Sequence, residues 1–228
     1  MPEARVGKAI HTALEKILLG TALFDAIAEA RQELDSDREL ARFDAIGTGI
    51  RPFVERIDDF RRRRNVRRQL IEFPLAINRD LASTTFYSGD ALYRGILDLA
   101  YVFDDDHLAL VDHKSGQRSG HRTIVEQLEG YAVLAAAYFR GVRRVWLGIH
   151  WVASGDLDWA RPVHTSDVNQ YFLPNVLDNI EAAALAVDDG PRANSGAWCE
   201  RCSYRSICPI GQQMRFEPVD DDEPEPWM

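Results

Sequence analysis

The chain has 228 residues, of which 46 % are hydrophobic and 28 % are charged, as in ordinary soluble globular proteins with one sizeable core. No apolar run approaches the ~18 residues of a membrane span and the first residues lack a secretory signal, so we expect a cytoplasmic protein. The net charge of −9 comes mostly from residues 217–228, which contain six acids and no Lys or Arg.

The N-terminal part of the chain is predicted to be helical. Residues 4–19 carry apolar side chains at helical spacing. A second helix is expected over residues 22–43 and a third between Gly49 and Asn65. We interpret residues 22–65 as a helical insertion that precedes the sheet.

Strands and helices follow in the rest of the chain. Hydrophobic patterns predict strands at residues 69–77, 96–103, 108–111 and 142–151, and helices at residues 121–140 and 168–186. A polar loop is expected between the first strand and residue 92. Helices followed by three strands, a helix and a strand indicate a mixed α/β fold. No internal repeat is visible.

Residues 51–68 form the most basic segment of the chain. They hold eight arginines against three acids: Arg51, Arg56, Arg61, Arg62, Arg63, Arg64, Arg67 and Arg68 against Glu55, Asp58 and Asp59. Such a run is either the solvated face of a helix or a patch that follows nucleic-acid phosphates. The second interpretation predicts a DNA contact through Arg61, Arg62, Arg63 and Arg64.

Residues 93–116, YRGILDLAYVFDDDHLALVDHKSG, are the most informative stretch. Three aspartates separate two apolar runs and indicate a hairpin turn. If the hairpin folds about Asp105, then Asp98 lies opposite Asp112, with Cβ atoms about 4.5–5.5 Å apart. Lys114 lies two residues after Asp112 and so belongs to the same face of the strand.

Two opposed carboxylates in apolar strands need a compensating charge. They repel each other unless a cation lies between them, and oxygen ligands suit a hard ion such as Mg²⁺ or Mn²⁺. With the ammonium of Lys114 on the same face, the arrangement predicts a site for phosphate chemistry and favours a nuclease. A surface hairpin with ordinary Asp and Lys residues is the alternative, but a charge among Leu, Ile and Val requires a partner or a metal.

Other polar residues are less informative by themselves. His11 lies on the first predicted helix, where a single histidine is more often a core or surface residue than a ligand. Gln127 and Tyr131 are four residues apart and share one face of the helix at 121–140, where packing is the ordinary explanation. His113 should point away from the face of Asp112 and Lys114, so we do not assign it a catalytic role.

All three cysteines of the chain lie within ten residues, in the string WCERCSYRSICP. Cys199, Cys202 and Cys208 form a predicted knuckle at residues 198–209. A redox CxxC pair would need a thioredoxin-like βαβ setting, so ligation of a metal or cluster is the better explanation. Closed zinc and iron–sulfur sites use four protein ligands, and here the cysteines supply three. The proline-rich acidic residues 217–228 are predicted to be a disordered tail.

Taken together, these strings resemble the RecB-like branch of the PD-(D/E)XK nuclease superfamily, which includes CRISPR-associated RecB-like exonucleases. The resemblance covers residues 7–209. It rests on six strings in the family's order: GKAIHTALE with His11, IEFPL with a frequent acid at Glu72, YRGILDL with Asp98, VDHKSG with Asp112 and Lys114, EQLEGYA with Gln127 and Tyr131, and CERCSYRSICP. Each string is weak alone, and their order and spacing give the match its strength.

The resemblance implies a restriction-endonuclease-like α/β core with the order αβββαβ, a mixed sheet flanked by helices, extra N-terminal helices and the cysteine knuckle, all in one domain of residues 1–216. It also implies site roles. His11, Asp98, Asp112 and the backbone carbonyl of residue 113 would hold one or two Mg²⁺ or Mn²⁺ ions. Lys114 would orient or deprotonate the attacking water, Gln127 would position that water or the DNA, and Tyr131 would contact the DNA backbone.

The cysteine site departs from the family pattern. Family members that carry a [4Fe–4S] cluster have a further cysteine ahead of the histidine helix, and no cysteine precedes Gly7 here. We expect either that the protein lacks the fourth ligand or that an N-terminal segment is missing from this sequence. A [4Fe–4S] cluster on Cys199, Cys202 and Cys208 would then need a non-cysteine ligand, a partner's residue or an open iron. Zinc would need an added histidine or acid.

The resemblance favours an exonuclease that processes DNA ends in recombination, repair, phage replication or CRISPR adaptation. Two alternatives use the same fold: a structure-specific endonuclease and a non-catalytic DNA-binding or assembly subunit. A zinc-dependent regulatory protein is supported only by the cysteines. The expected partners are DNA ends or single strands, together with a helicase, recombinase or integration protein, and the chain could form an oligomer.

Overall fold

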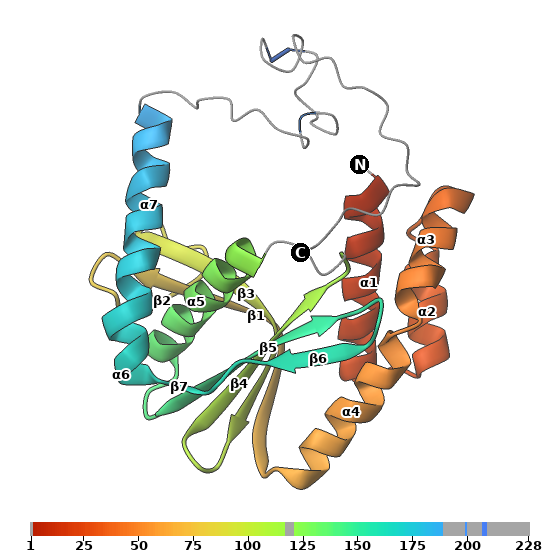
Figure 1. Ribbon diagram of the computed structural model, residues 1–228, viewed down its shortest axis with the longest axis horizontal. Helices are drawn as coiled ribbons and strands as arrows, with labels where there is room; N and C mark the ends of the chain where they lie inside the picture. The colour runs from red at the N-terminus through yellow and green to blue at the C-terminus, as the bar shows by residue number, and fades with distance from the viewer. Residues whose placement is uncertain (1, 117–120, 189–198, 200–206, 209–228) are drawn as a thin grey trace, which may run out of the picture. The chain divides into compact units, whose positions relative to one another are not determined.

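The computed structural model describes residues 2–116, 121–188, 199, 207 and 208. It divides into two compact units, Met1–Ile180 and Glu181–Met228. The architecture below is that of the first unit (Figure 1). None of the described helices is long and apolar enough to span a membrane.

Helices come first along the chain and strands follow. The N-terminal helices are α1 (Pro2–Leu18), α2 (Leu23–Arg31), α3 (Asp37–Gly47) and α4 (Ile50–Arg63). The strands that follow are β1 (Val66–Asn78), β2 (Ser83–Thr84), β3 (Ala91–Phe103) and β4 (His107–Lys114). Beyond them lie α5 (His121–Tyr138), β5 (Arg144–Trp151), β6 (Asp156–Trp159), β7 (Val163–His164), α6 (Thr165–Asp167), the π-helix η1 (Val168–Phe172) and α7 (Leu173–Asp188).

The strands form one mixed sheet in the order β2-β1-β3-β4-β5-β6, with β7 also paired to β5. Strands β4 and β5 are parallel, and α5 is the crossover helix between them, as a parallel pair requires. The other neighbouring strands are antiparallel. The sheet confirms the predicted mixed α/β fold. Along the chain, N-terminal helices are followed by three main strands, a helix and a further strand, as predicted. The short strands β2, β6 and β7 were not predicted, because two to four residues carry too little alternation to be recognised.

The prediction of one helix over residues 22–43 is wrong, because two helices occupy this segment. Ser36 adopts an extended conformation and its side chain accepts a hydrogen bond from the backbone N–H of Glu39, which caps the start of α3. The Glu39 carboxylate in turn accepts hydrogen bonds from the Ser36 hydroxyl and the backbone N–H of Asp35. This reciprocal capping satisfies the donors at a helix start and divides α2 from α3.

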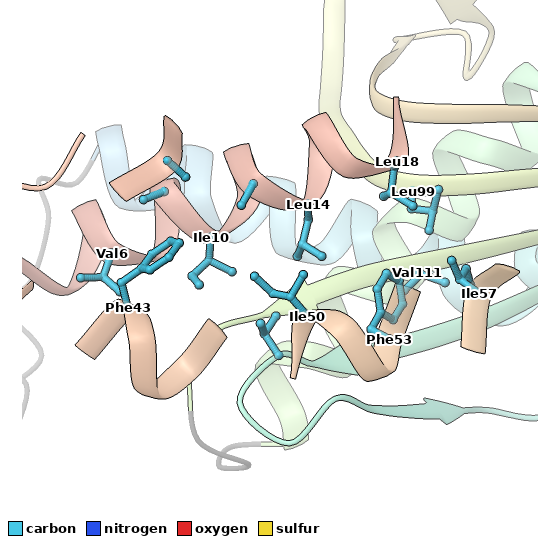
Figure 2. Packing of buried hydrophobic residues seen from close by; sticks show 14 of the residues in the cluster. Val6, Ile10, Leu14, Leu18, Phe43, Ile50, Phe53, Ile57, Leu99 and Val111 are labelled. Carbon is cyan, nitrogen blue, oxygen red and sulfur yellow. The ribbon is translucent and has the colours of Figure 1, made fainter. Parts of the chain in front are cut away.

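Two hydrophobic clusters hold the helices to the two faces of the sheet. The α1–α4 cluster joins α1 and α4 to one face (Figure 1). In Figure 2 the side chains of Ile10 and Leu14 of α1 lie near that of Ile50 of α4, and Phe53 of α4 lies beside Val111 of β4. The α5 cluster covers the other face and includes Leu128, Leu134 and Val176. The sheet is therefore a middle layer between helices.

Two glycines allow α5 to lie close to β3. A Cβ atom on Gly95 would lie 2.8 Å from Leu134 Cδ1 and 3.1 Å from the Tyr131 ring. A Cβ on Gly130 would lie 2.1 Å from the Tyr93 hydroxyl. Helix α5 can approach the strand only because neither position carries a side chain.

Replacing Gly95 by valine should lower the free energy of unfolding by about 1–3 kcal/mol, because overpacking pushes α5 away from β3. Urea denaturation monitored by circular dichroism measures this change. Gly89→Ala is the matched control, since a Cβ there meets nothing within 4 Å, and it should change stability by less than about 0.5 kcal/mol. Equal effects of the two substitutions would contradict close packing at Gly95.

Candidate active site

Helix α1 carries His11 to strands β1, β3 and β4. Its neighbour Ile10 is fully buried in the α1–α4 cluster, whereas the His11 side chain is 32 % exposed. The imidazole Nε2 lies 3.1 Å from the backbone carbonyl oxygen of His113. The other ring nitrogen, Nδ1, lies 3.8 Å from a carboxylate oxygen of Glu72 and 3.8 Å from one of Asp98. The packing of α1 therefore sets the histidine between a backbone carbonyl and two acids.

A break in side-chain alternation places Glu72 on β1. Leu70 packs in the α5 cluster and Ile71 in the α1–α4 cluster. Regular alternation would put Phe73 on the same face as Ile71, but Phe73 packs in the α5 cluster. Glu72 lies at this break with a φ of +46°, a left-handed conformation that costs a residue other than glycine about 1 kcal/mol or more. The backbone is held there against its intrinsic preference.

Strand β3 breaks its alternation at the opposite position. Ala100 packs in the α5 cluster and Leu99 in the α1–α4 cluster, and Leu97 is again in the α5 cluster. Asp98 lies at the break, and the register of β1 and β3 puts it opposite Glu72. Both carboxylates thus leave the ordinary alternation at the same place and come near His11.

The hairpin of β3 and β4 has the predicted register. Leu99 pairs with Val111 and Ala100 with Leu110, as a fold about residue 105 requires. The Asp98 carboxylate accepts a hydrogen bond of 2.7 Å from the backbone N–H of His113. Position 98 is therefore anchored to the strand that carries residues 112–114.

A chain of polar contacts runs from β4 to α5. Lys114 Nζ lies 2.7 Å from an Asp112 carboxylate oxygen, which confirms that the two side chains share a face. The ammonium donates a hydrogen bond of 2.6 Å to Gln127 Oε1. Gln127 Nε2 donates a hydrogen bond of 2.7 Å to the Tyr131 hydroxyl oxygen. These four predicted residues therefore form one connected network.

His113 points to the other face of β4, as predicted. Its Nδ1 lies 2.9 Å from Nδ1 of His150, and its ring stands edge-on to Phe53 of α4. Burial lowers the pKa of His113 well below its usual value, and burial followed by the charge of Arg56 lowers the pKa of His150 to about 3. Both rings are neutral at pH 7 and support the strand from behind.

The acids of the site are costly to ionise without a cation. Burial raises the pKa of Asp98 to about 7; His11 acts to lower it, whereas Asp112 and Glu72 raise it further. Burial also raises the pKa of Asp112, although Lys114 opposes the shift. For His11, burial acts to lower the pKa, but the facing Glu72 and Asp98 carboxylates outweigh it and the pKa is raised. The site therefore concentrates negative charge that a bound cation would stabilise.

The residues fit a divalent ion. One ligand atom each from His11, Glu72 and Asp98 lies within 4.8 Å of the others. Asp112 is not a member of this group. Its Oδ2 is buried and lies 2.7 Å from the Lys114 ammonium, which compensates part of its charge. Glu72 was recognised as an acid on its strand but left out of the predicted ligand set, and the role of Asp112 as a ligand stays a prediction.

The predicted DNA-contacting arginines lie at the other end of the sheet. Arg61, Arg62 and Arg63 end helix α4 and Arg64 follows it. Arg63 and Arg64 adjoin Phe103 at the end of β3, which is five residues from Asp98, or about 17 Å along a strand. Their DNA contact stays a prediction.

The cysteine knuckle at residues 198–209 and the tail at residues 217–228 fall largely or wholly outside the described residues. Cys199 and Cys208 are described and Cys202 is not. Neither the cluster, the disorder of the tail nor the single domain of residues 1–216 is tested, and all three stay predictions.

Replacing Asp98 by asparagine should stabilise the metal-free protein at pH 8. The unfolded-state pKa of the carboxyl is near 3.8 and the folded-state pKa is about 7, so the unfolded state holds fewer protons between these values and the wild type loses stability as pH rises. The stability difference between variant and wild type should therefore grow from about pH 4 to pH 7 and level off above. Urea denaturation in a chelator at four pH values measures it, and a difference that does not change with pH would contradict the shift.

Comparison with known proteins identifies the family. The profile of the PD-(D/E)XK nuclease superfamily matches residues 1–209. No curated protein matches the chain significantly. The superfamily implies a phosphodiesterase with a nucleic-acid substrate and typically uses divalent metals, which agrees with a site where His11, Glu72 and Asp98 could hold an ion. The chain belongs to the PD-(D/E)XK nuclease superfamily.

Proposed function

We propose that this protein is a Mg²⁺- or Mn²⁺-dependent DNA exonuclease of the RecB-like branch of the superfamily. The observation that carries the proposal is the convergence of His11, Glu72 and Asp98 beside the Lys114 network. The combination of His11 on the first helix and Glu72 on the first strand supports the RecB-like branch. Both residues lie in motifs that this sequence shares with that branch.

The metal would be held by His11, Glu72 and Asp98, with the buried Oδ2 of Asp112 and the carbonyl of His113 as further oxygen donors nearby. When bound, a divalent ion supplies positive charge that acidifies a water and offsets the charge on the phosphate in the transition state. His11 and Asp98 both have raised pKa values and must lose their protons to act as ligands. Metal affinity should therefore rise with pH through about 7.

Lys114 is placed to act on the attacking water or the scissile phosphate. Asp112 and Gln127 hold its ammonium from two sides at 2.7 and 2.6 Å, which fixes the position of a flexible side chain. A fixed ammonium stabilises developing negative charge without reorganisation. The lysine therefore orients the water and neutralises the phosphate.

Gln127 and Tyr131 extend this polar surface towards the DNA. Gln127 uses its carbonyl oxygen for Lys114 and its amide N–H for the Tyr131 hydroxyl oxygen. The Tyr131 O–H is left to donate to a phosphate oxygen. Burial raises the Tyr131 pKa, and Asp112 adds to the shift, so the hydroxyl keeps its proton at working pH.

Asp112→Asn and Lys114→Ala should each reduce Mg²⁺- or Mn²⁺-dependent DNA cleavage at least about a hundredfold, since the first removes the carboxylate that holds the Lys114 ammonium and the second removes the cation at the phosphate. Digestion of end-labelled linear DNA measures the rate. Asp25→Asn, on an exposed part of α2, is the control and should cleave as the wild type does. Unchanged cleavage in both site variants would refute the assignment.

The exonuclease assignment makes a separate prediction. Linear single-stranded DNA should be degraded, and a covalently closed circle of the same sequence should persist because it offers no end. Gel analysis of both substrates in Mn²⁺ tests this. Cleavage of the circle at a comparable rate would instead identify an endonuclease on the same fold.

A further inference from the structure

A cavity lined mainly by aromatic rings lies at the end of the sheet away from the acidic site. It encloses about 190 Å³, and its lining residues are Phe60, Arg64, Phe103, His107, Trp146 and Trp159. We call it the aromatic cavity. Drug-sized ligands occupy about 300–1,000 Å³, so this volume suits a single planar ring system.

Packing keeps the aromatic walls in place. The Phe60 ring centroid lies 5.7 Å from that of Trp159, nearly parallel to it, and 5.7 Å from that of Phe103, edge-on. Trp159 lies flat on β5 because Gly148 has no side chain; a Cβ there would be 2.7 Å from the indole. His107 is already engaged, with Nδ1 3.2 Å from an Asp105 carboxylate oxygen. The cavity therefore offers aromatic faces and few free polar groups.

A strongly basic groove adjoins the aromatic cavity. The arginine groove is lined by Asp58, Arg61, Arg62, Arg64, Asn65, Val66, Arg67, Arg68 and Gln69, so five arginines face one acid. Arg61 lies 3.6 Å from the Asp58 carboxylate. Among the described residues, no acid pairs with Arg64 or Arg67. The groove thus presents cations that are available to an anion.

Arg64 lines both the aromatic cavity and the arginine groove. A flat apolar cavity joined to a cationic groove matches the two halves of a nucleotide, the base and the phosphate. Aromatic stacking next to Arg side chains is how proteins bind single strands without reading their sequence. A duplex would not fit the cavity, because its bases are stacked and paired.

We propose that the aromatic cavity takes one unstacked base of a single-stranded DNA segment while the arginine groove binds the adjoining phosphates. This inference rests on the proposed function, because it assigns a second contact to the same substrate. Apart from Arg64, which is assigned to the phosphates, the cavity is lined by aromatic side chains, so we expect a base to be held by stacking and binding to be independent of sequence.

The outer edge of β1 connects this contact to the acidic site. Among the described residues, only β2 pairs with that edge, at Ala76 and Ile77. The preceding part of β1 runs from the arginine groove at Arg67–Gln69 to Glu72, three to five residues away, or about 10–17 Å along a strand. The second contact would hold a strand whose end lies at the metal-binding residues.

The test measures DNA binding in a chelator, where metal-dependent cleavage does not occur. Fluorescence anisotropy of the full chain with labelled (dT)12 should show at least tenfold weaker binding for Arg64→Glu. Arg140→Glu, an exposed control at the end of α5, should bind within twofold of the wild type. Arg64→Ala should also lower the slope of log affinity against log salt concentration by about 0.7, the value for one lost phosphate contact on a single strand.

The aromatic cavity is tested separately by photocrosslinking. An oligonucleotide with one 5-iodouracil should crosslink wild-type protein at Phe60, Trp146 or Trp159, mapped by mass spectrometry. Trp159→Ala should weaken (dT)12 binding about fivefold or more with the salt slope unchanged, because it removes stacking and no charge. The crosslink needs no substitution, so it remains informative if this variant folds poorly.

Two outcomes would overturn the inference. One is crosslinks that map only outside the cavity, together with wild-type binding by Arg64→Glu. The other is tighter binding of a duplex than of (dT)12. If the wild type cleaves DNA and this cleavage depends on Asp112 and Lys114, either result would refute the second contact and leave the nuclease function supported. If the wild type does not cleave DNA at all, the proposed function itself would be refuted.

Discussion

Buried carboxylates dominate the electrostatics of the acidic site. Asp98 and Asp112 are each less than a tenth exposed, and burial raises the pKa of both. Such groups stay ionised only where positive charge compensates them. Lys114 gives part of that compensation, His11 gives another part when protonated, and a divalent ion would give more. The elements around the site can be understood as means of bringing these charges together.

Each supporting element has a physical reason for its place. Helix α1 holds His11 because the neighbouring apolar residues are fixed in the α1–α4 cluster. Helix α5 holds Gln127 and Tyr131 against the ammonium because Gly95 and Gly130 allow it to approach β3. The cost appears in the backbone, where Glu72 is held at a positive φ. Strain at an acidic site of this kind is tolerated when the surrounding packing over-determines the conformation.

Much of the site could be predicted from sequence because its signals are local. Three aspartates between two apolar runs define the hairpin, and the midpoint at residue 105 sets the register that pairs Leu99 with Val111. The four-residue spacing of Gln127 and Tyr131 places both on one helix face. The break between α2 and α3 also had a local signal, the Ser36 and Glu39 capping pair, which the apolar periodicity obscured.

Other features depend on tertiary structure and have no local signal. The left-handed conformation of Glu72 cannot be inferred from the string IEFPL. Glu72 joins His11 and Asp98 as a candidate metal ligand only because β1 and β3 both break their side-chain alternation at this place. The aromatic cavity draws its lining from five separate elements. The arginines of the adjoining groove were visible as a basic run, but the indole and phenyl walls of the cavity are scattered along the sequence.

If His11, Glu72 and Asp98 form one site for a divalent ion, a calorimetric titration with Mn²⁺ at pH 8 should detect binding there. The wild type should bind Mn²⁺, and Glu72→Gln and Asp98→Asn should each weaken the affinity at least about tenfold, because each removes a charged oxygen ligand. Wild-type affinity in both variants would contradict the account.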